Sequence, residues 1–372
     1  MKRVIVSVIN DLVTDQRVDK ACRFLQNQGF DVLLVGRQLK NSMPVGIRTY
    51  RTHRMKLIWE KGPLFYAEFN IRLFFFLLFR RSSLLLSNDL DTLLPNYSIH
   101  RLKRIPIVYD SHELFTQTPE VTKRKFVQNT WKLIERCILP KLKSAYTVNT
   151  SLARIFRVMY KTDFGGVRNI PEQGNSAPIR NRKDLGLPEN KKIILLQGSG
   201  INMHRGAEEL VEAMQYLDDT YLLLIIGGGD VIDQLKYIAE NEEIKNKVMI
   251  KAKMPFYKLR QYTCNADLGV TIDKDTNPNY RYSLPNKLFD YIHAGLPIIS
   301  SKLFEIEKII SYYEIGDFIP DHAPENIAAK IKEMLGDTKK LEYWKENLKF
   351  AAKELTWQQE VKALKEVFRD YV

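Results

Sequence analysis

Residues 283–301 read SLPNKLFDYIHAGLPIISS. Pro285 precedes an amphipathic segment and Gly295 follows it, which predicts a short helix over residues 286–293. Residues 297–300 then form a short β-like run. A helix that leads directly into a buried strand is the repeating step of a parallel α/β sheet, so this stretch predicts that class of fold.

The same alternation continues on both sides of this stretch. Further strands are expected at residues 4–9, 31–35, 84–87, 105–109 and 145–148, and again at 192–197, 221–226, 248–250 and 268–272. Residues 165–188 are rich in Gly, Pro, Asn and Arg and predict a linker between the two series. We therefore expect two Rossmann-like, doubly wound domains that face each other across a cleft.

The net charge of the 372 residues is +13, and all of the excess lies in the first half. Residues 1–170 hold 29 Lys and Arg against 13 Asp and Glu. This asymmetry favours an anionic partner for that half, such as nucleic acid, an acidic lipid surface or a phosphorylated substrate, over a merely soluble basic face. Three cysteines without a C-x-x-C spacing exclude a disulfide framework and favour a cytoplasmic protein.

The longest apolar run is LFFFLLF at residues 73–79, flanked by Arg72, Arg80 and Arg81. It is too short to cross a bilayer, which takes about 20 residues. A buried helix and an amphipathic helix on a membrane surface both remain open.

Two segments of the second half have the features of a phosphate site. LLQGSG at 195–200 runs from a strand into a turn, and Arg205-Gly206 precedes the next helix. Such a turn lets a backbone approach a phosphate, although glycine there can also be required by the turn geometry alone.

In the second segment, Asn286 and Lys287 form the first turn of the predicted helix, where free N–H groups favour an anion. Asp290 is placed to bind ribose hydroxyls, or to form an intrahelical ion pair with Lys287.

Two segments of the first half end expected strands. YDSHE at 109–113 places His112 and Glu113 at the carboxyl edge of the sheet, where open parallel sheets bind ligands. A structural and a catalytic role for His112 are equally consistent with this position. NDLVTDQR at 10–17 is polar, faces the same cleft and contains no glycine. The carboxylate pairs Asp89/Asp91 and Asp273/Asp275 lack further ligands, so we expect no metal.

Together these segments resemble a GT-B glycosyltransferase of the large retaining family 4, glycosyl transferases group 1. The resemblance covers essentially the whole chain and is most specific at 283–301, with NDLVTDQRVDKACRFLQNQGFDV, VYDSHELF and GSGINMHRGAEELVEAM in support. It implies an acceptor domain at 1–167, a linker at 168–190, a nucleotide-sugar domain at 191–345 and a C-terminal helix at 346–372 that returns to the first domain.

The resemblance also implies roles for individual residues. Arg205 would hold the donor diphosphate, Asp290 the ribose, and Met254 would lie at the nucleobase. His112, Arg205 and Lys287 are the catalytic candidates. The donor-binding candidates are Ser199, Gly200, Arg205, Met254, Ser283, Leu284, Asn286, Lys287 and Asp290. The candidates on the acceptor side are Asn10, Asp11, Arg17, His112 and Glu113.

The chain departs from the family pattern at four places. Tyr282 stands where the first glutamate of the pattern falls, and Asp290 shortens the second. Ser199 replaces a second diphosphate-binding arginine, and Asn10-Asp11 replace glycines of the first loop. Lys287 or Arg17 would then supply the missing positive charge.

The resemblance implies transfer of a sugar, with retention, from a UDP-, GDP- or ADP-sugar to a hydroxyl acceptor, in surface polysaccharide or glycolipid assembly. The acceptor would be a saccharide or a lipid-linked saccharide. We expect no nucleic acid partner; peripheral contact of the basic first half with an anionic membrane is left open. The alternatives are a degenerate, non-catalytic GT-B protein that partners an active transferase, or another GT-B activity such as a sugar-nucleotide epimerase.

Overall fold

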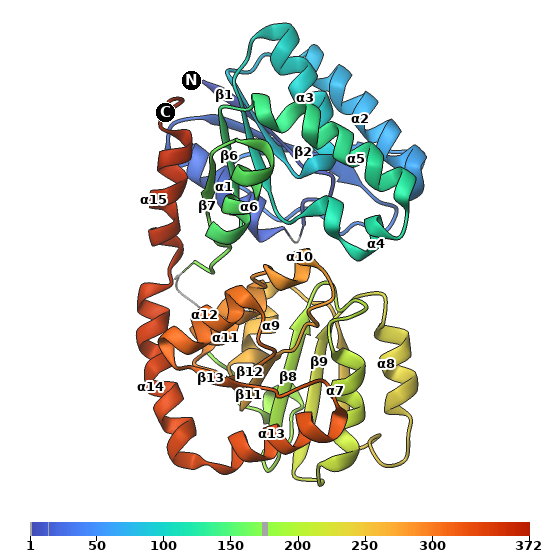
Figure 1. The fold of residues 1–372 in the computed structure, drawn as a ribbon, viewed down its shortest axis with the longest axis vertical. Coiled ribbons are helices and arrows are strands. Elements are labelled where there is room, and N and C mark those ends of the chain that lie inside the picture. Colours follow the sequence, from blue (N-terminus) through green and yellow to red (C-terminus); the bar gives the residue numbers. More distant parts are fainter. Residues whose placement is uncertain (1, 14, 173–177) are drawn as a thin grey trace. The chain divides into compact units, whose positions relative to one another are not determined.

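The computed structural model describes residues 2–13, 15–172 and 178–372. The chain divides into two compact units, residues 1–169 with 360–372, and residues 170–359. Each unit is a parallel sheet flanked by helices (Figure 1). The expected returning segment begins at Glu360 rather than at residue 346, because helix α14 (Thr338–Glu354) packs within the second unit.

Unit 1 contains a seven-stranded sheet in the order β3-β2-β1-β4-β5-β6-β7. Its strands are β1 (Arg3–Ser7), β2 (Asp31–Gln38), β3 (Arg51–Lys56), β4 (Leu84–Asn88), β5 (Ile107–Ser111), β6 (Ser144–Thr147) and β7 (Phe164–Gly166). Its helices are α1 (Gln16–Asn27), α2 (Gly62–Leu78), α3 (Leu90–Lys103), α4 (Pro119–Thr122), α5 (Lys125–Ile138), α6 (Thr150–Tyr160) and most of α15 (Trp357–Phe368). The strand order reverses between β1 and β4, so the carboxyl ends of β1, β4 and β5 form the expected ligand edge.

Unit 2 contains a six-stranded sheet in the order β10-β9-β8-β11-β12-β13. Its strands are β8 (Lys192–Gly198), β9 (Tyr221–Gly227), β10 (Val248–Ala252), β11 (Leu268–Thr271), β12 (Ile298–Ser300) and β13 (Gly316–Phe318). Besides α14, its helices are α7 (Ala207–Ala213), α8 (Ile232–Ala239), α9 (Phe256–Thr263), α10 (Pro278–Arg281), α11 (Asn286–Ala294), α12 (Phe304–Tyr313) and α13 (Pro324–Gly336). The order reverses between β8 and β11, which places the ligand edge of this sheet there.

The helix predicted from residues 283–301 is confirmed as α11. It ends at Gly295, whose φ of 68° is the left-handed conformation that suits glycine. Buried aliphatic side chains of β8 and β9 alternate between two apolar clusters, one on each face of the sheet. This two-sided burial is typical of a parallel sheet covered by helices.

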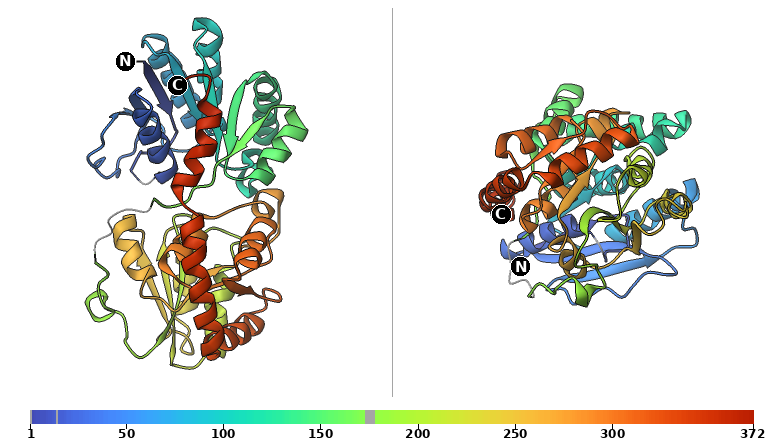
Figure 2. Two further views of the ribbon diagram at one scale, coloured as in Figure 1. Left: turned by 90° about the vertical axis from the view of Figure 1, so that its left-hand side faces the viewer. Right: turned by 90° about the horizontal axis from the view of Figure 1, so that it is seen from below.

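The last helix contributes to unit 1 (Figure 2, left). The Phe368 ring lies 5.7 Å from that of Phe24 on α1 and 6.2 Å from that of Tyr146 on β6. Lys2 Nζ also donates to the carbonyl of Tyr371 at 3.3 Å. The chain therefore crosses between the units twice, at residues 169–170 and 359–360.

Candidate active site

Arg205 of unit 2 is positioned by the glycine that follows it. Gly206 has φ +71°, and a Cβ there would lie 2.4 Å from the carbonyl oxygen of Ile272. Both the backbone conformation and the close approach to the end of β11 therefore require glycine. The Arg205 guanidinium lies over the Tyr280 ring, 4.9 Å from its centroid, and its Nη1 is 3.1 Å from Oδ2 of Asp273.

Asp273 contacts both of the cationic side chains that are predicted to bind the diphosphate, Arg205 and Lys287. It lies two residues beyond β11 and is fully buried. Its Oδ1 is 3.7 Å from Nζ of Lys287, in the first turn of α11. Burial lowers the pKa of Lys287, although the Asp273 carboxylate opposes this shift. One carboxylate faces two cations here, which leaves a net positive charge for an anionic ligand.

Asp290 is oriented by the end of β8. Gln197 is buried and donates from Nε2 to Oδ2 of Asp290 at 2.8 Å, while its Oε1 accepts from Thr263 Oγ1 at 2.7 Å. The Tyr291 hydroxyl, next along α11, lies 3.1 Å from the carbonyl of Leu195 and donates there. These bonds tie α11 to the carboxyl end of β8 and fix the side chain expected at the ribose.

The loop before α11 holds the remaining donor candidates. Ser283 Oγ is buried and has no hydrogen-bond partner among the described residues. Leu284 and Met254 pack against one apolar cluster. The Tyr282 ring meets that of Phe304 edge-on at 5.6 Å, so an aromatic contact occupies the position where the resemblance leads us to expect a carboxylate.

Three further donor candidates lie at element ends. Ser199 is exposed in the turn after β8, and Gly200 follows it half-buried. Asn286 is the exposed first residue of α11, a helix start that no side chain caps. Uncapped N–H groups at a helix start are available to an anion.

In unit 1, His112 lies between two carboxylates. Its Nδ1 is 3.1 Å from Oδ2 of Asp89, its Nε2 is 3.3 Å from Oδ2 of Asp110, and its backbone N–H donates to Asp89 Oδ1 at 2.9 Å. Burial alone would lower the pKa of His112, but the two carboxylates raise it to about 10. The ring is therefore an imidazolium at neutral pH, able to donate hydrogen bonds but not to accept a proton.

Arg17 pairs with Asp110 inside unit 1. Its Nε and Nη2 donate to the Asp110 carboxylate at 2.7–3.1 Å, and its Nη1 donates to the carbonyl of Val167 at 2.6 Å. Burial raises the pKa of Asp110, but Arg17 and His112 outweigh it and lower this pKa to about 2. A role of Arg17 toward a diphosphate stays a prediction; in this structure its buried guanidinium pairs with Asp110 within unit 1.

The first loop is held together by its own polar side chains. Asn10 Nδ2 donates to Asp15 Oδ2 at 2.6 Å, and Asp11 Oδ1 accepts from the backbone N–H of Val13 at 3.2 Å. A Cβ at Gly36 of β2 would lie 2.6 Å from the Asn10 carbonyl oxygen, so the loop packs closely on the sheet. Glu113 is half-buried. The acceptor role of Asn10, Asp11 and Glu113 stays a prediction.

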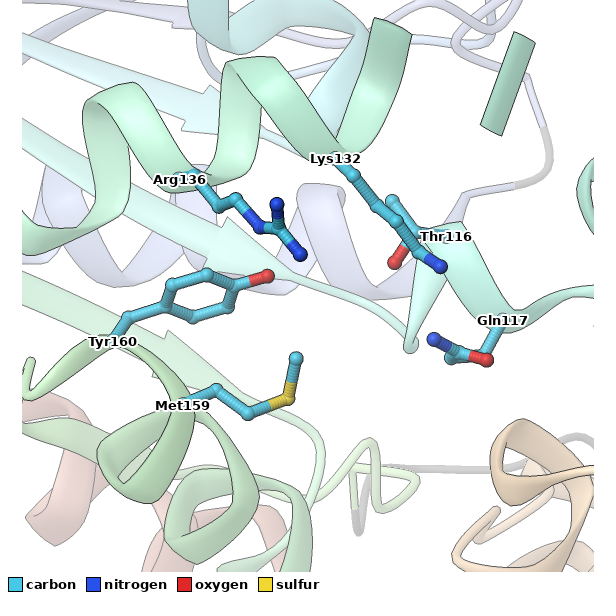
Figure 3. Close-up of a pocket in the computed structure, with 6 residues that line it drawn as sticks. All are labelled: Thr116, Gln117, Lys132, Arg136, Met159 and Tyr160. Carbon is cyan, nitrogen blue, oxygen red and sulfur yellow. The ribbon is translucent and has the colours of Figure 1, made fainter. Parts of the chain in front are cut away.

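A pocket that the sequence did not indicate lies between α5 and the end of α6 (Figure 3). Its lining consists of Thr116, Gln117, Lys132, Arg136, Met159 and Tyr160. The hydroxyls of Tyr160 and Thr116 donate to one oxygen of the buried Glu135, at 2.9 and 3.0 Å. This polar core fixes the wall of the pocket, while Lys132 and Arg136 make it basic.

Comparison with known proteins shows which family model and which relatives the chain is similar to. Residues 179–349 match the model of the family described as Glycosyl transferases group 1. The match covers 171 of the 372 residues, all of them in unit 2. An uncharacterized glycosyltransferase of Methanocaldococcus jannaschii is 24% identical over 173 residues, 46% of this chain and 43% of its own. The D-inositol 3-phosphate glycosyltransferase of Xylanimonas cellulosilytica is 19% identical over 50% of this chain and 44% of its own. The chain thus spans less than half the length of these two relatives.

Solved structures resemble this chain over its full length. Sucrose-phosphate synthase from Thermosynechococcus elongatus has a TM-score of 0.79 at 17% identity, covering 100% of this chain and 99% of its own. Anabaena HepE in complex with UDP-glucose has a TM-score of 0.75 at 12% identity, covering 100% of both chains. The predicted fold class, two Rossmann-like domains of the GT-B type, is confirmed.

Sequence reasoning missed the residues that hold the candidates in place. Asp273 and Asp89 were considered only as members of carboxylate pairs too sparse to bind a metal. Gln197 was considered only as part of the glycine-containing turn at 195–200. All three lie at or just after strand ends, which was the available signal. Within the described ranges, no group of three or more His, Cys, Asp or Glu side chains is placed to hold a metal ion.

Proposed function

We propose that this protein is a group 1 glycosyltransferase that transfers a sugar from a nucleotide-sugar to a hydroxyl acceptor, with retention at the anomeric carbon. The observation that carries the proposal is the convergence of Arg205 and Lys287 on the buried carboxylate of Asp273. The two cations lie at the reversal point of the unit 2 sheet, where α/β folds of this kind bind nucleotides. Their excess positive charge suits a diphosphate.

The donor is a UDP-, GDP- or ADP-sugar. UDP-sugars are the first to test, because the HepE structure contains UDP-glucose. In this proposal the Asp290 carboxylate accepts hydrogen bonds from the ribose hydroxyls, and Met254 lies beside the base. Ser283 Oγ, buried without a partner among the described residues, binds a phosphate or sugar oxygen.

In the reaction, the acceptor oxygen bonds to the anomeric carbon as the bond from that carbon to the diphosphate oxygen breaks. Attack on the face that the diphosphate leaves gives retention, and the hydroxyl proton passes to the departing phosphate oxygen. Arg205 and Lys287 stabilise the negative charge that develops on the leaving group. His112, charged at neutral pH, contributes a positive charge rather than acting as a base.

The acceptor is proposed to be a saccharide or a lipid-linked saccharide bound by unit 1, in surface polysaccharide or glycolipid assembly. Unit 1 carries the chain's excess positive charge, which suits an acceptor that bears phosphate. We propose a cytoplasmic protein with peripheral contact to an anionic membrane. No helix of the described residues is long and apolar enough to span a bilayer.

Tyr282 supports a second candidate, a nucleotide-binding protein without turnover, since its ring packs on Phe304 where the family carries a carboxylate. Thermal unfolding with UDP, GDP and ADP, followed by assays of nucleotide release from their sugars, separates the two candidates. We expect one nucleotide to raise the Tm of the wild type and its sugar to be turned over. Stabilisation without release would favour the second candidate, and no response to any nucleotide would contradict both.

A further inference from the structure

An exposed apolar stripe follows helix α2 of unit 1. Four of its side chains are more than half exposed, with Leu64 at 57%, Ile71 at 58%, Phe75 at 52% and Phe79, just past the helix end, at 80%. The first three are spaced seven and four residues apart, so they lie on one line along the helix. The opposite side of α2 is buried through Phe65, Phe69, Leu73 and Leu77. The run LFFFLLF is thus buried on one side and exposed on the other.

The neighbouring helix α3 extends this surface. The two helices pack side by side (Figure 1), and Lys103 Nζ donates to the carbonyls of Leu77 and Arg80 at 3.0 and 2.9 Å. Lys103 thereby holds the carboxyl end of α3 against the end of α2. Leu102, beside it, is 62% exposed.

Around the carboxyl end of the stripe, beyond the Glu68–Arg72 pair, all of the charged side chains up to residue 88 are basic. No acidic residue occurs between positions 69 and 88 or between 92 and 109. Arg81, Arg101 and Arg104 are exposed and form no ion pair with any described residue. Arg80 lies over the Phe76 ring, with its Cζ 4.8 Å from the centroid. Exposed apolar side chains and arginines without ion pairs among the described residues therefore occur together at the joined carboxyl ends of α2 and α3, which we call the α2–α3 face.

We propose that the α2–α3 face docks on an anionic lipid bilayer. Phe75, Phe79 and the aliphatic side chains would enter the boundary between headgroups and acyl chains, while the arginines would meet lipid phosphates. A bilayer satisfies both features, whereas a purely apolar partner would leave the arginines without counter-charges. The inference deepens the proposed function by naming the surface that meets a lipid-linked acceptor, but its test does not depend on turnover.

The test is co-sedimentation of the full chain with vesicles of phosphatidylcholine, with and without 30% phosphatidylglycerol, at low and high salt. We expect binding to the anionic vesicles that high salt weakens. F75S/F79S and R81E/R104E should each bind at least fivefold less. Two controls alter exposed residues of unit 2. Y237S removes an exposed aromatic side chain, and K258E/K339E reverses two exposed positive charges. Both should bind as the wild type does.

Three outcomes would overturn the proposal: no binding to anionic vesicles, equal loss in the controls, or a wild-type dimer that F75S/F79S converts to monomer. The last result would assign the face to a second copy of the chain. Nucleotide stabilisation and turnover of a water-soluble acceptor, measured on the same variants, report separately on the proposed transferase. A failure of docking is thus distinguishable from a failure of the proposed function.

Discussion

The ammonium of Lys287 lies 3.7 Å from Oδ1 of Asp273, and both side chains are buried. Arg205 contacts the other oxygen of the same carboxylate at 3.1 Å. Asp273 therefore acts as the internal counter-ion of the proposed diphosphate site. An incoming diphosphate would compete with it for both cations.

Asp273→Asn should destabilise unit 2 and make it more responsive to nucleotide. Removing the carboxylate leaves two cations close together without their counter-charge, at a cost of about 3 kcal/mol. A bound diphosphate would restore the missing negative charge. The variant should therefore have a lower Tm than the wild type and a larger rise in Tm with the stabilising nucleotide.

The control for this variant is Asp275→Asn, which removes an exposed carboxylate paired with Arg281. It should change the Tm little, because both side chains of the pair are exposed and solvent screens their attraction. If Asp273→Asn left both the Tm and the nucleotide response unchanged, Asp273 would not be the counter-ion of this site.

Arg205→Ala should lower kcat/KM at least about 100-fold, the loss typical when a group that stabilises transition-state charge is removed. Nucleotide stabilisation should fall with it, because the same guanidinium binds the ground-state diphosphate. Arg281→Ala removes an exposed arginine of the same unit that pairs with Asp275, and it should retain activity. Full turnover by Arg205→Ala would remove Arg205 from the mechanism.

Gly206→Ala tests whether the backbone positions Arg205. The substituted residue would have to adopt φ +71° with its Cβ 2.4 Å from the Ile272 carbonyl oxygen. We expect a loss of about 2–4 kcal/mol in the free energy of unfolding of unit 2, together with reduced kcat/KM. Gly228→Ala is the matched control, because its Cβ meets nothing within 4 Å. Equal effects of the two substitutions would contradict the positioning role.

The sequence predicted the sheets and the elements that carry the candidate site, because strand and helix periods depend on local pattern. The helix at 286–293 and the turn before Arg205 are examples. It did not predict which side chains pair, because pairing depends on strand order. β11 lies beside β8 although 69 residues separate Gly198 from Leu268, and this adjacency brings Asp273 to Arg205. The pairing of Arg17 with Asp110 was not predicted for the same reason, since Asp110 lies 93 positions away in sequence.

The His112 cluster predicts how the stability of unit 1 depends on pH. The folded pKa of about 10 lies above the ordinary value of 6.5, so the stabilisation is fully present below pH 6.5 and is lost as pH rises toward 10. Asp110, with a folded pKa of about 2, contributes stability above pH 3.8 that is lost as pH falls toward 2. The Tm of the unit 1 transition, followed from pH 6 to pH 10, should therefore decline.

His112→Gln should lower the Tm at pH 6 and flatten this decline. The control His322→Gln, on unit 2, should leave the decline unchanged. An equally steep decline in His112→Gln would show that the imidazolium between Asp89 and Asp110 is not its source.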